Sequence, residues 1–374
     1  MLAATVGCTN PDDSQPNAIF VTTTTKALPD DVQQASTTTP DGPVLRGVCP
    51  ETLVVQMAGP LDLWAMPWTT MLAIDGIGSG TGYIAQMVHP STREPTGIRI
   101  ELRQVLPPEQ TVADVLRTDP SIHLGVLPSD VAVARRSQSP VVFLAAPWLH
   151  DDRILYWNAA FNPEARSLAD LTTDPDVTLL GSTDDPVVAY LTGTNLVTRS
   201  QVTASAAVVQ FGNFLADPAG WLSANATTRW QFLAETGWSP YPHAVVAAPA
   251  SLAANSRCFE ALVPLLQRAV VEMEKQPERM VANLAEIAAR NAISIDQNLT
   301  MAKLRAAIDN GLLNRVENET VAEVTPARIE QALRADATSR RVRGLSNAST
   351  GKLRQLAKTL IVDFTVNVIE TTGE

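Results

Sequence analysis

The 374-residue sequence has few of the residues that build metal and redox sites. It contains three cysteines and four histidines, and no CxxC, HxxxH or HExxH spacing occurs. These absences exclude zinc ribbons, thioredoxin-like sites and helical histidine metal sites. The GxxxxGK[ST] and GxSxG motifs are also absent, and the glycine-rich run 76–82 does not follow GxGxxG spacing. We therefore predict no catalytic residue, no metal and no cofactor.

Basic residues and long apolar runs are scarce as well. Lys and Arg number 28 against 39 Asp and Glu, which gives a formal net charge of -11. Nucleic-acid binding needs clustered positive charge, so we expect no nucleic-acid partner. No run approaches the roughly 20 apolar residues of a membrane span. Hydrophobic residues still make up 45% of the chain, enough for a packed, water-soluble body.

The N-terminal segment differs in composition from the rest of the chain. A short apolar stretch leads through Gly7 into Cys8, and residues 9–48 are rich in Thr, Pro, Asp and Ser without a packing pattern. A small residue before a cysteine at the end of an apolar stretch resembles a bacterial lipoprotein cleavage site. We interpret residues 1–8 as a signal remnant, Cys8 as the lipidation site and 9–48 as a disordered tether. No Lys or Arg precedes Cys8, so the alternative is a polar tail with a chance cysteine.

Beyond residue 49, short apolar segments alternate with helical ones. The runs 52–57 and 98–103 predict strands, the second by its alternation of apolar and polar residues. Further strands are expected at 123–127, 141–145, 177–181, 206–210, 230–233 and 244–247. Helices are expected between them at 111–116, 167–171, 187–191 and 212–215. This alternation predicts an α/β fold with mixed, mostly parallel sheets.

The C-terminal third predicts helices. Apolar residues recur every three or four positions over 259–273, 280–288 and 301–312, and Thr325-Pro326 is typical of a helix start. Pro264 marks either the true first turn of its helix or a kink. We expect these helices to pack on the α/β part.

Four stretches carry a resemblance to a known family. They are CPETLVVQ at 49–56, RSLADL at 166–171, GWLSANAT at 220–227 and SRCFEALVPLLQ at 256–267. Together they resemble the extracytoplasmic substrate-binding proteins of ABC transporters, of the nitrate/sulfonate/taurine/thiamine-precursor type and its actinobacterial lipoprotein branch. The resemblance implies a two-lobed periplasmic-binding-protein-like fold of type II. Lobe 1 would comprise 49–155 with 250–374, and lobe 2 would comprise 156–249.

The expected ligand site lies in the cleft between these lobes. In open α/β sheets, ligands sit beyond the carboxyl ends of the strands. That rule and the 221–225 segment of the resemblance select eight ligand-binding residues: Asp62, Trp64, Asp130, Ser182, Thr183, Trp221, Ser223 and Asn225. No Lys or Arg lies in these loops, so we expect a small neutral or singly charged organic solute. Residues 150–152 (His-Asp-Asp) are interpreted as a solvated turn.

The sequence departs from the family in two ligand-facing regions. Asn225-Ala226-Thr227 stands where the family branch has Glu-Pro-Tyr. Residues 57–61 replace the acidic and aromatic residues that usually follow the entry strand. The identity of the ligand therefore does not carry over.

The remaining cysteines form a pair. If Cys8 is lipidated, Cys49 and Cys258 are an even remainder in an oxidising compartment, and a disulfide between them is expected. The alternative is two buried free thiols.

These observations favour a lipid-anchored solute-binding protein on the outer face of the cell membrane. As a monomer it would deliver its solute to ABC permease subunits by lobe closure, without enzymatic activity. Two alternatives stay open: a sensor or scaffold module that binds without transport, and a precursor-synthase-type enzyme on the same fold. The enzyme would need a cleft site bearing histidine and cysteine, and the sequence shows no such cluster.

Overall fold

The computed structural model describes residues 44–78, 82–161, 163–172, 177–181, 186–192, 197–199, 207–223, 228–314, 321–342 and 350–364. Cys8 and most of the predicted tether lie outside these ranges. Leu45, near the end of that predicted tether, is fully buried, and its N–H donates to the carbonyl of Thr96 (2.8 Å). Leu45 therefore packs into the core, four residues before Cys49.

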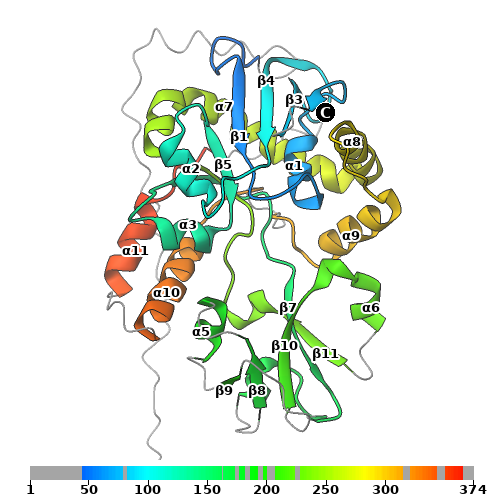
Figure 1. Ribbon diagram of the computed structural model, residues 1–374, viewed down its shortest axis with the longest axis vertical. Helices are drawn as coiled ribbons and strands as arrows, with labels where there is room; N and C mark the ends of the chain where they lie inside the picture. The colour runs from blue at the N-terminus through cyan, green and yellow to red at the C-terminus, as the bar shows by residue number, and fades with distance from the viewer. Residues whose placement is uncertain are drawn as a thin grey trace, which may run out of the picture. The chain divides into compact units, whose positions relative to one another are not determined.

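The first sheet has seven strands in the order β2-β3-β4-β1-β5-β12-β6 (Figure 1). β1 (Thr52–Gln56) lies parallel to β4 (Pro95–Arg103) and β5 (Leu124–Leu127). Four further strands pair antiparallel with their neighbours: β2 (Ile77–Gly78), β3 (Gly82–Val88), β6 (Val142–Ala145) and β12 (Ala244–Ala247). Every residue of β5 and all but Thr52 of β1 are buried, because both faces of the sheet are covered.

The second sheet has five strands in the order β11-β7-β10-β8-β9. β7 (Arg153–Asn158) pairs antiparallel with β11 (Thr228–Phe232) and β10 (Ala207–Asn213), whereas β8 (Val177–Leu180) lies parallel to β10 and β9 (Val197–Arg199). The chain leaves the first sheet after β6 and returns to it in β12. Two crossing segments, 146–152 and 237–243, therefore join the sheets.

The predicted mixed α/β fold is confirmed. The expectation of mostly parallel strands holds only for β4-β1-β5 in the first sheet and for β10-β8-β9, which reaches the edge, in the second. Among the strands described, four pairings are parallel and six are antiparallel. β3 and β7, which the sequence did not indicate, account for four of the antiparallel pairings. The domain boundaries stay a prediction; sheet pairing places β7, from Arg153, in the second sheet and β12, to Ala247, in the first.

Short helices connect the strands of both sheets. They are α1 (Met66–Thr69), α2 (Val112–Thr118), α3 (Ser129–Arg135), α4 (Leu168–Leu171), α5 (Pro186–Thr192) and α6 (Pro218–Ser223). At the start of α2, the Thr111 side chain accepts from the N–H of Asp114, whose carboxylate accepts from the N–H of Thr111. This reciprocal cap satisfies two amides that a helix start leaves free. The helix expected at 212–215 is instead the end of β10 followed by the 3-10 turn η3 (Phe214–Ala216).

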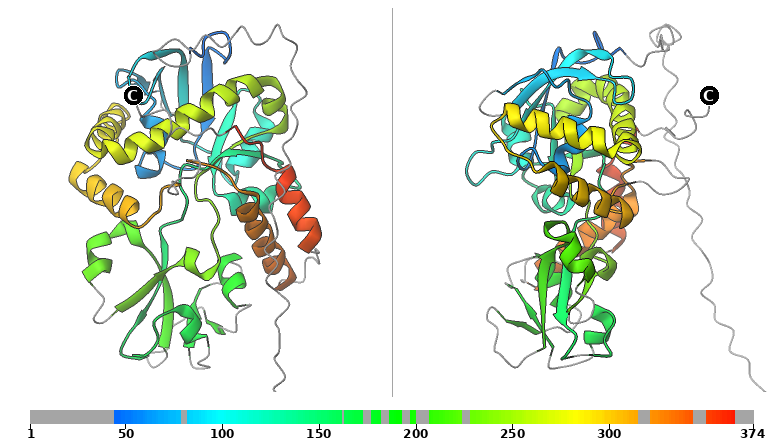
Figure 2. Two further views of the ribbon diagram at one scale, coloured as in Figure 1. Left: turned by 180° about the vertical axis from the view of Figure 1, so that it is seen from behind. Right: turned by 90° about the vertical axis from the view of Figure 1, so that its right-hand side faces the viewer.

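The C-terminal part is helical, as predicted (Figure 2). It contains α7 (Pro249–Lys275), α8 (Pro277–Arg290), α9 (Gln297–Asp309), α10 (Pro326–Val342) and α11 (Thr350–Thr359). Pro264 lies inside α7, and the non-helical backbone is at Asn255, nine residues earlier. No helix in the described ranges is long and apolar enough to cross a membrane.

Three apolar clusters form the core of the described residues. Two of them cover opposite faces of the first sheet: Leu53 and Val55 of β1 belong to one, and Val54 belongs to the other. The third packs around the second sheet and includes Ala335 of α10. Because α10 also contributes Ile329 and Leu333 to a cluster of the first sheet, it packs against both sheets' cores.

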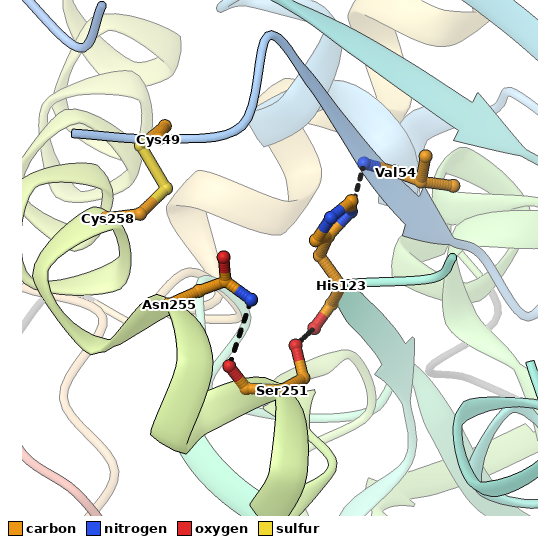
Figure 3. The surroundings of a disulfide bond; sticks show 6 residues. All are labelled: Cys49, Val54, His123, Ser251, Asn255 and Cys258. Carbon is orange, nitrogen blue, oxygen red and sulfur yellow. Dashed lines mark hydrogen bonds between the residues drawn. A yellow bond between two sulfur atoms is a disulfide. The ribbon is translucent and has the colours of Figure 1, made fainter. Parts of the chain in front are cut away.

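The predicted disulfide is present between Cys49 and Cys258, whose Cα atoms are 4.6 Å apart (Figure 3). It ties the entry to β1 to helix α7. Nearby, the N–H of Val54 donates to Nδ1 of His123 (3.0 Å), and the Ser251 hydroxyl donates to the His123 carbonyl (2.7 Å). His123 is thus a partnered residue of the structural core.

Candidate functional site

A cavity of about 420 Å³ lies where the two sheets and helix α9 meet. Its lining comes from the turn after β1, the ends of β7 and β10, and the α8–α9 region. The lining residues are Asp62, Leu63, Trp64, Asp152, Asn213, Leu215, Ala216, Ser294, Ile295, Asp296, Leu299, Thr300 and Lys303. The volume falls at the small end of the range for small-molecule sites.

The first wall is the 3-10 turn η2 (Leu63–Ala65). Asp62 caps this turn, and its carboxylate accepts from the N–H of Trp64 (3.0 Å). Desolvation raises the pKa of Asp62 above its ordinary value, opposed by the backbone hydrogen bonds and by the charge of Lys303. The turn follows the carboxyl end of β1, which is where the α/β rule places ligand contacts.

Trp64 anchors this wall to both crossing segments. Its ring stacks on His243 (centroids 4.7 Å apart) and meets Trp148 edge-on at the same separation. The indole N–H of Trp148 donates to the Trp64 carbonyl (3.1 Å). Burial lowers the pKa of His243 to about 4, so the ring stays neutral at physiological pH. The wall is therefore fixed to the junction between the sheets.

The second wall lies at one end of the strands of the second sheet, where Asp152 precedes β7 and η3 follows β10. The Asp152 carbonyl accepts from the N–H of Phe214 (2.8 Å), and its carboxylate accepts from the N–H of Leu215 (3.1 Å). Asp152 thus joins the first crossing segment to η3. Desolvation, helped by the charge of Asp151, raises the pKa of Asp152 to about 6. The expectation of a solvated turn at residues 150–152 is wrong, because all three residues are half-buried.

Helix α9 closes the third side. Asp296 caps the helix, and its carboxylate accepts from the N–H of Leu299 (3.0 Å). Lys303 lies two turns along the helix and contributes the basic group of the lining. The α9 helix also packs against α8, η2, η3 and α6. Sequence reasoning did not assign α9 to the site, because its pattern shows only an amphipathic helix.

Only some of the residues expected at the ligand site line the cavity. Asp62 and Trp64 line the cavity. Asp130 does not, although it lies near Asp151 and Arg153 of the junction, and burial raises its pKa. Ser182, Thr183 and Asn225 lie outside the described residues, as does the lipidation site Cys8.

The two other expected residues, Trp221 and Ser223, belong to α6. Trp221 packs on Tyr156 (centroids 5.0 Å apart), and its indole N–H donates to the carbonyl of the lining residue Asn213 (3.2 Å). Ser223 is exposed at the end of α6. Neither residue is part of the cavity lining.

The cavity offers carboxylates, one amine, hydroxyl groups and an apolar surface. Such a set can bind a small polar solute by hydrogen bonds and charge. Within the ranges described above, no cluster of three or more His, Cys, Asp or Glu residues could hold a metal ion.

Comparisons with known proteins give distant structural similarities. No protein-family model matches the chain, and no curated protein matches it. Among solved structures, the aliphatic sulphonate-binding protein SsuA of Escherichia coli shares 14% identity over 82% of this chain and 92% of its own, with a TM-score of 0.44. The nitrate-binding protein NrtA of Synechocystis PCC 6803 shares 10% identity over 83% of this chain and 86% of its own, at 0.43.

A third similar structure is the ligand-binding component of an ABC-type import system from Staphylococcus aureus, solved with zinc bound. It shares 10% identity over 83% of this chain and 99% of its own, with a TM-score of 0.46. The chain itself has two mixed sheets joined by two crossing segments, flanking helices and a helical C-terminal part. This is the two-sheet α/β architecture that the family resemblance in the sequence implies.

Proposed function

We propose that this protein is an extracytoplasmic solute-binding protein, without enzymatic activity, that delivers a small organic solute to an ABC importer. The observation that carries the proposal is the cavity at the junction of the two sheets. Its walls come from η2 on one side and from Asp152 and η3 on the other. A solute that touches both walls favours the arrangement in which they are close and shifts the population toward it.

The disulfide supports an extracytoplasmic location. Disulfides persist in oxidising compartments and are rare where thiols are kept reduced. Cys258 is buried in the core and Cys49 packs against it. We further propose that Cys8 carries the lipid anchor and that permease subunits are the partners of the monomer.

The cavity can be tested with two variants on one helix. Thr300 lines the cavity, whereas Ala302 lies exposed on the same helix outside the lining. A tryptophan at position 300 should fill the space, so Thr300→Trp should lose the bound solute and Ala302→Trp should keep it. Mass spectrometry of small molecules released from gently purified protein identifies the solute, and calorimetry then measures its affinity for each variant.

Two outcomes would contradict the proposed cavity. One is equal solute affinity in both variants. The other is wild-type protein that neither releases a small molecule nor binds any member of a solute panel. Small-angle scattering adds a further check, because lobe closure predicts a smaller radius of gyration with solute.

The wider cleft is tested separately with Trp221→Ala and Asn225→Ala. Lower affinity in these variants would extend the ligand contacts beyond the cavity. Unchanged affinity would restrict the site to the lining residues.

The anchor is tested by Cys8→Ser in protein expressed in a bacterial host that processes lipoproteins. The change should move the protein from the membrane to the soluble fraction. Retention at the membrane would show that any anchor lies elsewhere.

A further inference from the structure

The cavity lining carries an unbalanced set of charges. Asp62, Asp152 and Asp296 are acidic and Lys303 is basic, which leaves two excess negative charges when all four are ionised. Each carboxylate accepts a hydrogen bond from a backbone N–H, from Trp64, Leu215 and Leu299 respectively. A carboxylate has about four acceptor positions, so a backbone amide leaves capacity for another donor.

None of the three carboxylates is ion-paired with another described residue. Among the described residues, no Lys, Arg or His lies within ion-pair distance of Asp62 or Asp152. The basic group nearest in sequence to Asp152 is Arg153, and it pairs with Asp151 instead (Nε to Oδ2, 2.6 Å). Arg153 therefore already has a carboxylate partner, and that partner is Asp151.

Two carboxylates elsewhere that are more deeply buried than Asp62 and Asp152 have ion-pair partners. Glu272 pairs with Arg279 at 2.9 Å, and Asp336 pairs with Arg136 at 2.7 Å. Leaving a buried carboxylate unpaired is costly, since desolvation favours its neutral form. Such a cost at a cavity wall indicates that a partner arrives with the ligand.

An anion is the poorer match for this cavity. The start of helix α9 borders the cavity, and the free amides of a helix start attract anions. Here Asp296 already occupies the cap with its own carboxylate. An incoming anion would meet this charge as well as those of Asp62 and Asp152.

We infer that the cavity selects an organic cation, a solute with one protonated nitrogen whose N–H groups donate to the carboxylates of Asp62 and Asp152. This inference rests on the proposed function and names the class of its solute. The apolar body of the solute contacts Leu63, Trp64 and Leu215, which line the same space. Lys303 opposes a second positive charge, so the solute carries one.

Three probes of matched size test the charge preference. Benzylamine is a cation at pH 7.5, benzyl alcohol is neutral and benzoate is an anion. We expect benzylamine to bind at least about 10-fold more tightly than benzyl alcohol, with benzoate weakest, because charge-assisted hydrogen bonds exceed neutral ones. Ligand-observed NMR titrations at low salt give the three dissociation constants.

Four variants test whether the preference for benzylamine arises in the cavity. Asp62→Asn and Asp152→Asn should each bring the amine-to-alcohol ratio toward one. Lys303→Met should tighten benzylamine binding, since it removes a like charge. Asp309→Asn is the matched control, because it makes the same charge change at an exposed position of α9 outside the lining. Thermal melts of each variant verify folding.

The outcomes separate this inference from the proposed function. Equal or tighter binding of benzyl alcohol or benzoate in the wild type would overturn the cation preference and leave the solute-binding proposal intact. An amine preference unchanged in both aspartate variants would overturn the assignment to this cavity. If no probe binds, the inference falls, and the Thr300→Trp comparison decides separately whether the cavity holds a solute.

Discussion

At the scale of single residues, Asp152 is a carboxyl group whose pKa lies well above its ordinary value. Its carboxyl has a pKa of about 6, raised from 3.8 by desolvation and the neighbouring Asp151. A raised acid pKa means that the folded state binds the proton more tightly than the unfolded chain does. Stability is therefore lost as pH rises from about 4 through 6, and the whole penalty is present above that range.

Asp152→Asn should consequently stabilise the protein at pH 8. Asparagine keeps an acceptor for the N–H of Leu215 and removes the buried charge. We expect a gain of roughly 1–2 kcal/mol at pH 8 that vanishes below about pH 4. Urea unfolding across this pH range measures it, with the exposed Asp309→Asn as a flat control. A loss of stability at pH 8 would contradict the assignment of an unpaired carboxylate.

The contribution of His150 to the free energy of unfolding should depend on pH in the opposite direction. Burial and the charge of Arg328 lower its pKa to about 4, from 6.5, so the folded state holds the ring neutral. The unfolded chain takes up a proton as pH falls below 6.5, and stability is lost between pH 6.5 and 4. His150→Gln should therefore reduce the slope of stability against pH in this window. An unchanged slope in urea titrations would place the acid sensitivity at other groups.

At the scale of elements, α10 holds the two crossing segments through one side chain. The Arg328 guanidinium donates to the carbonyl of Leu149 in the first segment and to the carbonyl (2.9 Å) and hydroxyl (2.7 Å) of Ser239 in the second. It also lies 4.3 Å from the centre of the Tyr241 ring. A planar fork with several donors can satisfy all these groups at once, and an ammonium cannot.

Arg328→Ala should therefore cost about 3 kcal/mol of unfolding free energy, because it leaves buried acceptors without donors. Arg328→Lys should recover only part of this loss. Arg305→Ala is the control, since its ion pair with Glu278 is exposed and worth at most about 1 kcal/mol. Equal, small effects of Arg328→Ala and Arg305→Ala in urea unfolding would show that the crossing segments hold together without Arg328.

At the scale of the whole molecule, the disulfide closes a loop that contains the entire second sheet. Cys49 and Cys258 are 209 residues apart in sequence, and β7 to β11 lie between them. A crosslink over so long a loop removes much of the freedom of the unfolded chain. In the chain-entropy model this stabilises the fold by about 5 kcal/mol.

The Cys49→Ser, Cys258→Ser double variant should lose stability by up to that amount. Reduced wild-type protein should behave like the double variant in denaturant unfolding. If reductant leaves the wild-type midpoint unchanged, or if both thiols react under denaturing, non-reducing conditions, the disulfide is absent from the protein in solution.

The sequence by itself determined the features that depend on near neighbours. The apolar run of β1, the cap formed by Thr111 and Asp114 and the helices of the C-terminal part all follow from local spacing and chemistry. The α/β class followed from the alternation of such segments. The cysteine pair was found by counting, since only two remained after Cys8.

Only the tertiary structure decided the composition of the cavity. Asp62 and Trp64 could be selected because they follow the carboxyl end of a predicted strand, and both line the cavity. Asp152 and Lys303 could not, because nothing in their own segments shows what packs against them. Their burial and charge environment are set by η3 and α9, which come from distant parts of the chain. Local sequence fixes which elements form, whereas desolvation and charge balance arise only when those elements meet.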